Sequence, residues 1–223
     1  MTKRILLEST GDGSHTLFVP ELNEHYHSVN GAIQESQHVF IEAGLKHCSK
    51  NKISIFEVGF GTGLNAFLSL LYGMDSGKII SYSAIEFFPL PSNIIDSLNY
   101  AGQVSSDNEY IFKKLHSSDW NKKTEITPVF SLTKINADFR FFNNNSSELY
   151  DLVFFDAFAP EKQPEMWTQE IFDHLYVSTA PDGIIVTYCA KGEVRRMMQK
   201  SGYCVERLPG PPGKREMLRG TKQ

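Results

Sequence analysis

The fold of this chain is decided by a stretch that runs from Ile53 to Asn65 and reads ISIFEVGFGTGLN. A short apolar run rich in β-branched residues leads into three alternating glycines, and an apolar segment of helical character follows from Leu64 to Leu71. This order predicts a strand, a tight turn and a helix, which together can hold a small polar ligand on backbone amides. Glycine permits the positive φ angles of such a turn and lets a ligand approach without meeting a Cβ.

The spacing of the glycines separates two classes of nucleotide ligand. A dinucleotide-binding turn needs the pattern G-x-G-x-x-G. Here Leu64 stands where the last of those glycines would be, and Glu57 precedes the turn, so that the pattern reads E-x-G-x-G-x-G. We interpret this departure as pointing to S-adenosylmethionine rather than NAD.

Length and composition exclude several classes of protein. The 223 residues suffice for one sizeable core and are few for two full domains. The net charge of −4 gives no global attraction to nucleic acid. We expect a cytoplasmic protein without a membrane segment, because no hydrophobic leader is present and all apolar runs are shorter than the ~20 residues of a membrane helix. We also expect it to be a monomer. The three widely spaced cysteines are expected to be reduced thiols, and the seven histidines show no metal-ligand spacing, so that no metal is expected.

Strand-like and helix-like segments alternate beyond the glycine turn. Expected strands cover residues 78–86, 130–135, 150–155 and 184–189; expected helices cover 36–45, 91–98, 169–178 and 193–200; a helical insertion is expected within 102–128, a loop at 143–147 and a turn at 181–183. This alternation predicts βαβ units and a parallel sheet. We therefore predict an α/β, Rossmann-like fold with a mostly parallel seven-stranded sheet. The last two strands, 203–208 and 216–219, should form an antiparallel C-terminal hairpin, because no helix separates them.

The N-terminal residues differ from this pattern. Two strand-like runs, residues 4–7 and 16–19, are separated by the turn cluster Gly-Asp-Gly-Ser at 11–14. We predict a small N-terminal β lobe over residues 1–34, packed on a main domain that covers residues 35–223.

Four polar features follow predicted strands: the glycine turn, Glu86, the segment 136–138 and Asp156. In open α/β sheets, ligands bind beyond the carboxyl ends of the strands. Each acid alone could be only a turn former or a helix cap, but the four together outline a nucleoside site. In this interpretation the glycine amides bind an amino-acid tail, Glu86 binds the ribose hydroxyls, and Asp138 binds the adenine amino group.

Two carboxylates require reasons of their own. Glu57 lies inside a predicted strand, where its burial would be justified if it bound a backbone or ligand ammonium. Asp156 begins the sequence Asp-Ala-Phe-Ala-Pro, a stiff lip that would place its carboxylate beside an incoming amine. With an ordinary pKa near 3.9 it would be a poor base for an alkylammonium near 10, so we expect it mainly to orient the amine. The alternative is that Asp156 only caps the following segment.

The C-terminal part of the chain is basic. From Gly183 onward there are nine lysines and arginines against three glutamates. This asymmetry suggests an anionic partner larger than a metabolite, with Lys191, Arg195, Lys214 and Arg215 as candidate phosphate contacts. The alternative is a solvated basic face.

Several motifs resemble the methyltransferase domain of the MnmC family. They are DGSHTL at 12–17, YHS at 26–28, QES at 34–36, the glycine stretch, DAFAP at 156–160 with PEMW at 164–167, and GKREMLR at 213–219. The resemblance spans about residues 5 to 220. It implies a class I methyltransferase fold, the methyl donor S-adenosyl-L-methionine, and conversion of 5-aminomethyl(-2-thio)uridine to 5-methylaminomethyl(-2-thio)uridine at the wobble position of tRNA. No second nucleotide-binding unit is evident, so we expect a stand-alone form without FAD.

The resemblance also implies roles for individual residues. Asp156 would be catalytic, and Phe158, Trp167 or Tyr188 would stack on the unstacked wobble base, although each of these aromatics could instead be a core residue. The cofactor would be held by Tyr26, Glu35, Ser36, Glu57, Gly59, Gly61, Gly63, Asn65, Glu86 and Asp138.

Two other functions fit part of the sequence. An aminopropyltransferase would share the sheet and the acids at its strand ends, but would be expected to have several acids around the amine pocket. A non-catalytic tRNA-binding scaffold would be favoured by a degenerate glycine turn or by loss of Asp156, and both are intact.

Overall fold

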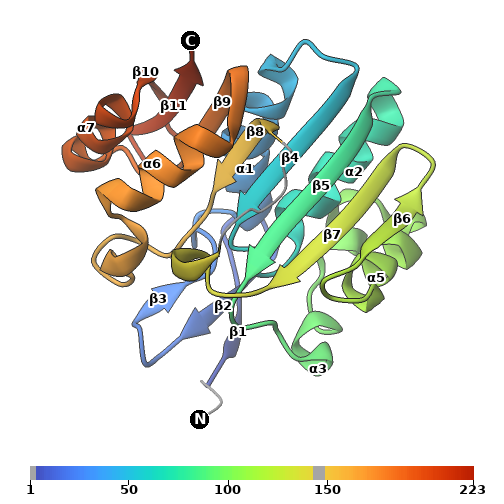
Figure 1. Ribbon diagram of the computed structural model, residues 1–223. Coiled ribbons are helices and arrows are strands. Elements are labelled where there is room, and N and C mark those ends of the chain that lie inside the picture. The colour runs from blue at the N-terminus through green and yellow to red at the C-terminus, as the bar shows by residue number, and fades with distance from the viewer. Residues whose placement is uncertain (1–3, 143–148) are drawn as a thin grey trace.

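The central element of the structure, a computed structural model that describes residues 4–142 and 149–223, is an eight-stranded sheet. Its strand order is β10-β11-β9-β8-β4-β5-β7-β6. Figure 1 shows β4, β5 and β7 side by side, ending at the same edge of the sheet. The strands are β4 (Lys52–Val58), β5 (Ile79–Glu86), β6 (Lys123–Thr127), β7 (Phe130–Asn136), β8 (Tyr150–Phe155), β9 (Thr179–Thr187), β10 (Tyr203–Pro209) and β11 (Glu216–Lys222). The segment 143–147, for which a loop was expected, lies outside the described residues.

The expected α/β class is confirmed, with corrections to particular elements. Strands β7, β5, β4, β8 and β9 are parallel, and β11 and β10 form the antiparallel end. The eighth strand is β6, which pairs antiparallel with β7 at the opposite edge. β6 lies in the segment that was expected to be only helical. It was not predicted because its short polar pattern lacks the apolar alternation of a strand. The turn expected at 181–183 is instead an irregularity within β9, where Asp182 has a φ of 60°.

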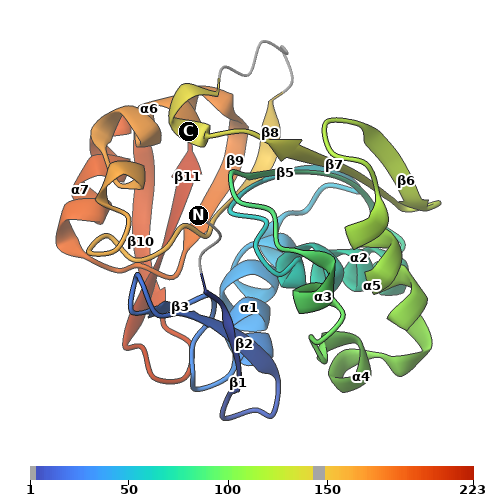
Figure 2. The same cartoon turned by 90° about the horizontal axis from the view of Figure 1, so that it is seen from below.

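Helices cover both faces of the sheet, as Figure 2 shows from below. One face carries α1, α2 and α5, and the other carries α6 and α7. The α-helices are α1 (Ala32–Ser36), α2 (Leu64–Ser76), α3 (Ser92–Ile95), α4 (Tyr100–Val104), α5 (Glu109–Ser117), α6 (Gln169–Ser178) and α7 (Gly192–Ser201). A π-helix continues α1 over Gln37–Glu42, and 3₁₀ turns lie at Leu45–His47, Ser106–Asn108, Phe139–Phe141 and Pro164–Met166. The helix expected at 36–45 therefore begins earlier, and the one expected at 91–98 is shorter.

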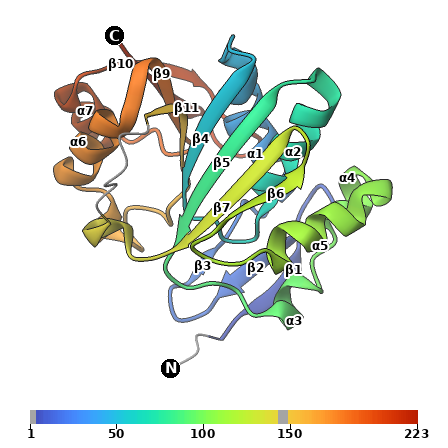
Figure 3. The same ribbon diagram turned by 45° about the vertical axis from the view of Figure 1, so that its right-hand side comes forward.

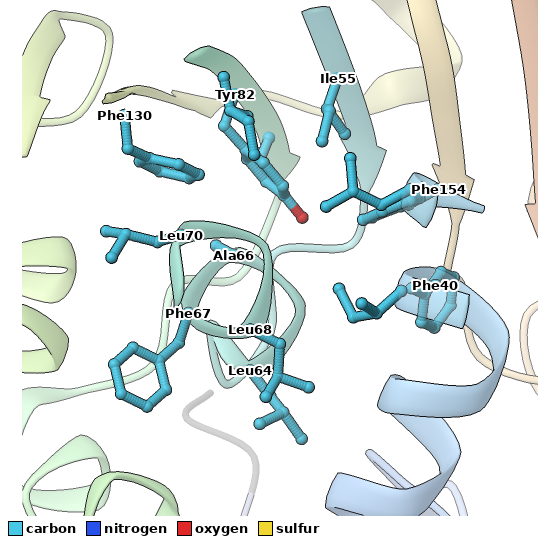
Figure 4. Close-up of a cluster of buried hydrophobic side chains, with 14 of the residues drawn as sticks. Phe40, Ile55, Leu64, Ala66, Phe67, Leu68, Leu70, Tyr82, Phe130 and Phe154 are labelled. Atoms are coloured by element: carbon cyan, nitrogen blue, oxygen red, sulfur yellow. The ribbon is translucent and has the colours of Figure 1, made fainter. Parts of the chain in front are cut away.

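The two cores follow from the alternation of side chains along the strands. In β4, Ile53 and Ile55 point to the α2 side, whereas Phe56 and Val58 point to the α6 side. Figure 4 shows α2 beside the sheet, with Ala66 and Leu70 on the side that faces the strands and Leu64 and Phe67 on the side turned away from them. The packing of α2 against the sheet fixes the position of the helix, and thereby the position of the glycine turn at the helix N-terminus.

A small antiparallel sheet lies beyond the carboxyl ends of the parallel strands (Figures 1 and 3). It consists of β1 (Leu6–Ser9), β2 (His15–Val19) and β3 (Glu24–His25). The backbone N–H of His15 donates to Asn99 Oδ1 at 2.8 Å, and His27 Nε2 lies 2.8 Å from Thr62 Oγ1 in the glycine turn. The small sheet is thereby positioned over the edge of the large sheet at which parallel α/β folds bind their ligands. Within the described ranges, no helix is both long and apolar enough to span a membrane.

Candidate active site

A cavity of about 900 Å³ lies at the carboxyl ends of the parallel strands. Its walls come from the glycine turn after β4, the segments after β5, β7 and β8, and residues of the small N-terminal sheet. Strands β4 and β8 are neighbours, and the chain proceeds outward from them in opposite directions. The cavity therefore lies at the topological switch point of the sheet, where open α/β folds bind ligands.

The glycine turn uses left-handed backbone conformations. The φ angles are 95° at Gly59, 48° at Gly61 and 71° at Gly63. Their amides all donate inside the protein: Gly59 to Ile85 O at 3.0 Å, Gly61 to Glu86 Oε2 at 3.0 Å, and Gly63 to Phe60 O at 2.8 Å. The expectation that these amides face a ligand is therefore not met. The glycines instead provide the turn and bare backbone, and Gly59 and Gly61 line the cavity.

Glu86 and Asp138 both line the cavity, with their carboxylates engaged. Glu86 accepts the amides of Gly61 at 3.0 Å and Phe88 at 2.8 Å, which fixes its carboxylate at the end of β5. Asp138 pairs with Arg140, whose hydrogen bonds hold the pKa of the Asp138 carboxyl below its usual value. An adenine amino group that contacted Asp138 would thus have to share the carboxylate oxygens with Arg140.

Asn65 joins two carboxyl groups, that of the buried Glu57 and that of the half-buried Asp156. Its Nδ2 donates to Glu57 Oε1 and to Asp156 Oδ2, both at 2.9 Å. This fork fixes the orientation of the amide, and its Oδ1 is buried without a hydrogen-bond partner. Asn65 lines the cavity, whereas Glu57, which is 1% exposed, lies behind it. A buried acceptor without a partner is a place for a ligand donor, because leaving it unpaired is costly.

Burial perturbs both of these carboxyl groups. It raises the pKa of Glu57 well above its ordinary value, with Asp156 as a further cause and Asn65 opposing. The Glu57 Oε2 and the nearby Tyr82 hydroxyl both lack a hydrogen bond of normal geometry. Burial also raises the pKa of Asp156 to about 7; Glu35 adds to this rise, while Asn65 and Lys214 oppose it. The assumption of an ordinary pKa for Asp156 was therefore wrong, because the sequence does not reveal its desolvation.

An ion pair lies in the same cavity as Asp156. Lys214 Nζ donates to Glu35 Oε1 at 2.6 Å and lies 3.8 Å from the centroid of the Tyr188 ring. The other Glu35 oxygen accepts the amide of Ser28 at 2.7 Å. Lys214 was expected to contact phosphate, but its side chain reaches into the cavity instead.

The segment that follows Asp156 is held in place by aromatic neighbours of Phe158. The Phe158 ring meets Tyr26 edge to face, with their centroids 5.1 Å apart, and both residues line the cavity. Trp167 was expected to stack on a base, but it is 6% exposed and its Nε1 donates to Phe158 O at 2.7 Å. It is thus a core residue that supports the lip.

Ten of the residues named from the sequence line one cavity. They are Tyr26, Glu35, Gly59, Gly61, Asn65, Glu86, Asp138, Asp156, Phe158 and Lys214. Seven are outside its lining: Ser36, Glu57, Gly63, Trp167, Lys191, Arg195 and Arg215.

The basic residues outside the cavity have separate environments. Lys191 pairs with Glu161, Arg195 is half-buried, and Arg215 is exposed. The four lysines and arginines proposed as phosphate contacts are therefore not grouped at one point, since Lys214 lies inside the cavity.

Sequence reasoning missed several lining residues. His27 anchors Thr62, and burial lowers its pKa to about 4, so that it is neutral near pH 7. Phe87 and Phe88 are about half exposed beside Glu86. His27 could have been found from the YHS motif, whereas the two phenylalanines carry no signal beyond their position after a strand. Within the described part of the chain, no group of three His, Cys, Asp or Glu could hold a metal ion.

Several known proteins are similar to this chain. A family model described as an S-adenosyl-L-methionine-dependent methyltransferase matches residues 109–223. The tRNA 5-methylaminomethyl-2-thiouridine biosynthesis bifunctional protein MnmC of Campylobacter hominis is 27% identical over 208 residues, which are 91% of this chain and 31% of that protein. The protein of the same name from Pseudomonas fluorescens is 30% identical over 208 residues, 87% of this chain and 32% of that protein. The chain thus spans about a third of the length of these relatives.

Solved structures show the same likeness. MNMC2 from Aquifex aeolicus superimposes with a TM-score of 0.82 and 25% identity, covering 100% of this chain and 71% of that one. Spermidine synthase from Thermotoga maritima has a TM-score of 0.55 at 15% identity, covering 100% of this chain and 75% of that one, which is a likeness of fold alone.

Proposed function

Because this chain belongs to the S-adenosyl-L-methionine-dependent methyltransferase family, we propose that it methylates the primary amine of 5-aminomethyl(-2-thio)uridine at the wobble position of tRNA. The product would be 5-methylaminomethyl(-2-thio)uridine. The observation that carries the proposal is the hydrogen bond from Asn65 to Asp156, which holds a half-buried carboxylate at the switch point of the sheet. The substrate class follows the name of the MnmC relatives.

The residues present fit the methyl donor of the family. The orphaned Asn65 Oδ1 is a buried acceptor suited to an ammonium group, and the fixed carboxylate of Glu86 is suited to ribose hydroxyls. Gly59 and Gly61, which line the same cavity, offer backbone without a Cβ. Bound S-adenosylmethionine would supply an electrophilic methyl group.

The role of Asp156 follows from its protonation. With a pKa of about 7, its carboxyl group can exchange a proton near neutral pH. As a carboxylate it accepts a hydrogen bond from the substrate amine and directs the nitrogen lone pair. After methyl transfer it can take a proton from the nitrogen and release it to water. Phe158 and Tyr26 would pack against the unstacked base.

The remaining residues would position tRNA. Lys191, Arg195 and Arg215 lie outside the cavity, where phosphate contacts would orient the substrate without reading its sequence. We further propose, from the likeness to the MnmC proteins, that the protein acts in the cytoplasm.

A labelling experiment tests this function. The protein is incubated with S-adenosylmethionine labelled in its methyl group and with tRNA that lacks the final wobble methylation, and the digested nucleosides are identified by mass spectrometry. We expect the label on aminomethyluridine only. A parallel reaction with decarboxylated S-adenosylmethionine and putrescine should give no aminopropyl product. Absence of label from aminomethyluridine would refute the proposal.

The Asp156→Asn variant is the matched control. It keeps the size of the side chain but removes the carboxylate, so we expect turnover to be lost while the dissociation constant for S-adenosylmethionine changes little. Near-normal turnover in this variant would remove Asp156 from the mechanism.

A further inference from the structure

A lysine from a distant part of the chain enters the cavity beside the catalytic carboxylate. Lys214 lies in the loop between β10 and β11, where its amide donates to Pro211 O at 2.9 Å. The Gly210 amide donates to Arg215 O at 3.1 Å, and Gly213 has a φ of 85°. These features close the loop tightly and point it toward the cavity, in whose lining Lys214 is found.

The surroundings of the Lys214 ammonium are fixed on two sides. Glu35, whose side chain is 8% exposed, holds the ammonium with one oxygen at 2.6 Å and the Ser28 amide with the other at 2.7 Å. The Tyr188 ring lies under the ammonium at 3.8 Å, and its hydroxyl donates to Ala157 O at 2.8 Å. The ring is thereby tied to the residue that follows Asp156.

Several titratable groups face Asp156. Glu57 and Tyr82 approach from β4 and β5, Glu35 from α1, Tyr188 from the end of β9, and Lys214 from the β10–β11 loop. Among these, Glu35 favours the protonated form of Asp156 and Lys214 favours the ionised form. Lys214 is also the one positive charge in this group.

We propose that Lys214 is a positioning residue that offsets the negative charge of Glu35 beside the amine site. Its ammonium keeps Asp156 ionised as a hydrogen-bond acceptor and favours the neutral, nucleophilic form of the substrate amine. The part of this inference that concerns the substrate amine rests on the proposed function, whereas the part that concerns the ionisation of Asp156 does not.

The physical reason is the charge seen by the amine. A primary alkylammonium between two carboxylates, Glu35 and Asp156, would keep its proton firmly, because each negative charge stabilises the cation. A neighbouring cation has the opposite effect and is a known means of making an amine nucleophilic at neutral pH. Lys214 is close enough to pair with Glu35, yet it makes no ion pair with Asp156 within 4 Å. The Asp156 carboxylate is thus left to accept a bond from the substrate.

Three variants and a control test the first part without any substrate. The protonation of Asp156 is followed by NMR of ¹³C-labelled aspartate carboxyl groups, and its signal is assigned with Asp156→Asn. In Lys214→Met we expect its titration midpoint to rise by about one pH unit, and in Lys214→Arg, which keeps the charge, to stay near the wild-type value. In Glu35→Gln we expect the midpoint to fall, so the proposal remains testable if Lys214→Met does not fold. Lys46→Met removes an ion pair of the same 2.6 Å length outside the cavity and should leave the midpoint unchanged.

The second part is tested by the pH profile of methyl transfer to aminomethyl tRNA. Lys214→Met should be about tenfold slower than wild type near neutral pH and should recover part of the loss as the pH rises toward 10, where the amine loses its proton without help. A purely structural role would lower the rate equally at all pH values. An unmoved Asp156 midpoint in both Lys214→Met and Glu35→Gln, or a loss of rate independent of pH, overturns the inference. If the midpoints move as expected but wild-type protein methylates no tRNA, the proposed function fails while the electrostatic effect on Asp156 stands.

Discussion

A methyl group added at Gly59 should impair both stability and cofactor binding. Gly59 has a φ of 95°, a conformation that residues with a Cβ rarely adopt. A Cβ at this position would lie 2.6 Å from the backbone oxygen of Asp156. The Asp156 amide donates to Val58 O at 3.0 Å, which ties the two strand ends together and limits how far Asp156 can shift.

The size of the effect can be worked out from this geometry. An ordinary contact begins at 3.4 Å, so the carbonyl must retreat by 0.8 Å (3.4 − 2.6). A positive φ at alanine costs about 1–2 kcal/mol, and overpacking of this kind adds about 1–3 kcal/mol. Gly59→Ala should therefore lower the free energy of unfolding by about 2–5 kcal/mol.

Gly77→Ala provides the matched control. Gly77 has a φ of 71°, and a Cβ there would meet no atom within 4 Å. This variant should show only the backbone cost of about 1–2 kcal/mol. It should also bind the cofactor normally, because Gly77 follows the far end of α2.

Urea unfolding measures the stabilities, and calorimetric titration measures the dissociation constant for S-adenosylmethionine. We expect Gly59→Ala to weaken binding at least tenfold (about 1.4 kcal/mol), since the displaced carbonyl belongs to the residue that contacts Asn65. If Gly59→Ala proves no less stable than Gly77→Ala and binds the cofactor as wild type does, the argument from close approach is refuted.

Three further predictions concern neighbouring groups. Burial lowers the pKa values of His27 and His116 to about 4. The unfolded chain therefore binds more protons than the folded protein between about pH 6.5 and 4. The free energy of unfolding should fall on acidification through this window, by at most about 3 kcal/mol per histidine. Replacing both with glutamine should flatten the pH dependence measured by urea unfolding, and an unchanged slope would contradict the assignment. Trp167→Phe loses the hydrogen bond to Phe158 O and should lower the free energy of unfolding by about 1 kcal/mol in the same assay, whereas wild-type stability would count against a supporting role. Glu86→Gln loses the charge and one of the two oxygens that accept the amides of Gly61 and Phe88, so it should lower the free energy of unfolding by about 1–3 kcal/mol, and calorimetry should show about tenfold weaker cofactor binding; equal affinity would exclude Glu86 from the site.

The main elements could be predicted from the sequence because their signals are local. The run 150–155 is β8 with the expected bounds, and Asp156 follows it as a polar residue at a strand end. The helix predicted at 169–178 matches α6, which begins after Thr168, whose side chain accepts from the Ile171 amide. Strand β6 was missed because only its pairing with β7 gives its polar residues an extended conformation.

Residue types at the strand ends also predicted much of the site, but not how its members interact. Nothing in the sequence pairs Lys214 with Glu35, which are 179 residues apart, or places Asn65 between Glu57 and Asp156. The amides of the three glycines were expected to face a ligand, yet Ile85 O, the Glu86 side chain and Phe60 O accept their hydrogen bonds.

The sequence by itself determined the order of the five parallel strands, the left-handed turn at the glycines, and the positions of Glu86 and Asp156 at strand ends. These properties depend on the periodicity of apolar residues and on the conformational freedom of glycine, which act within a few residues along the chain. Only the tertiary structure decided the protonation of Asp156 and the entry of Lys214 into the cavity. Desolvation and charge pairing depend on which groups are brought within a few ångströms of one another, and that is settled when distant segments pack together.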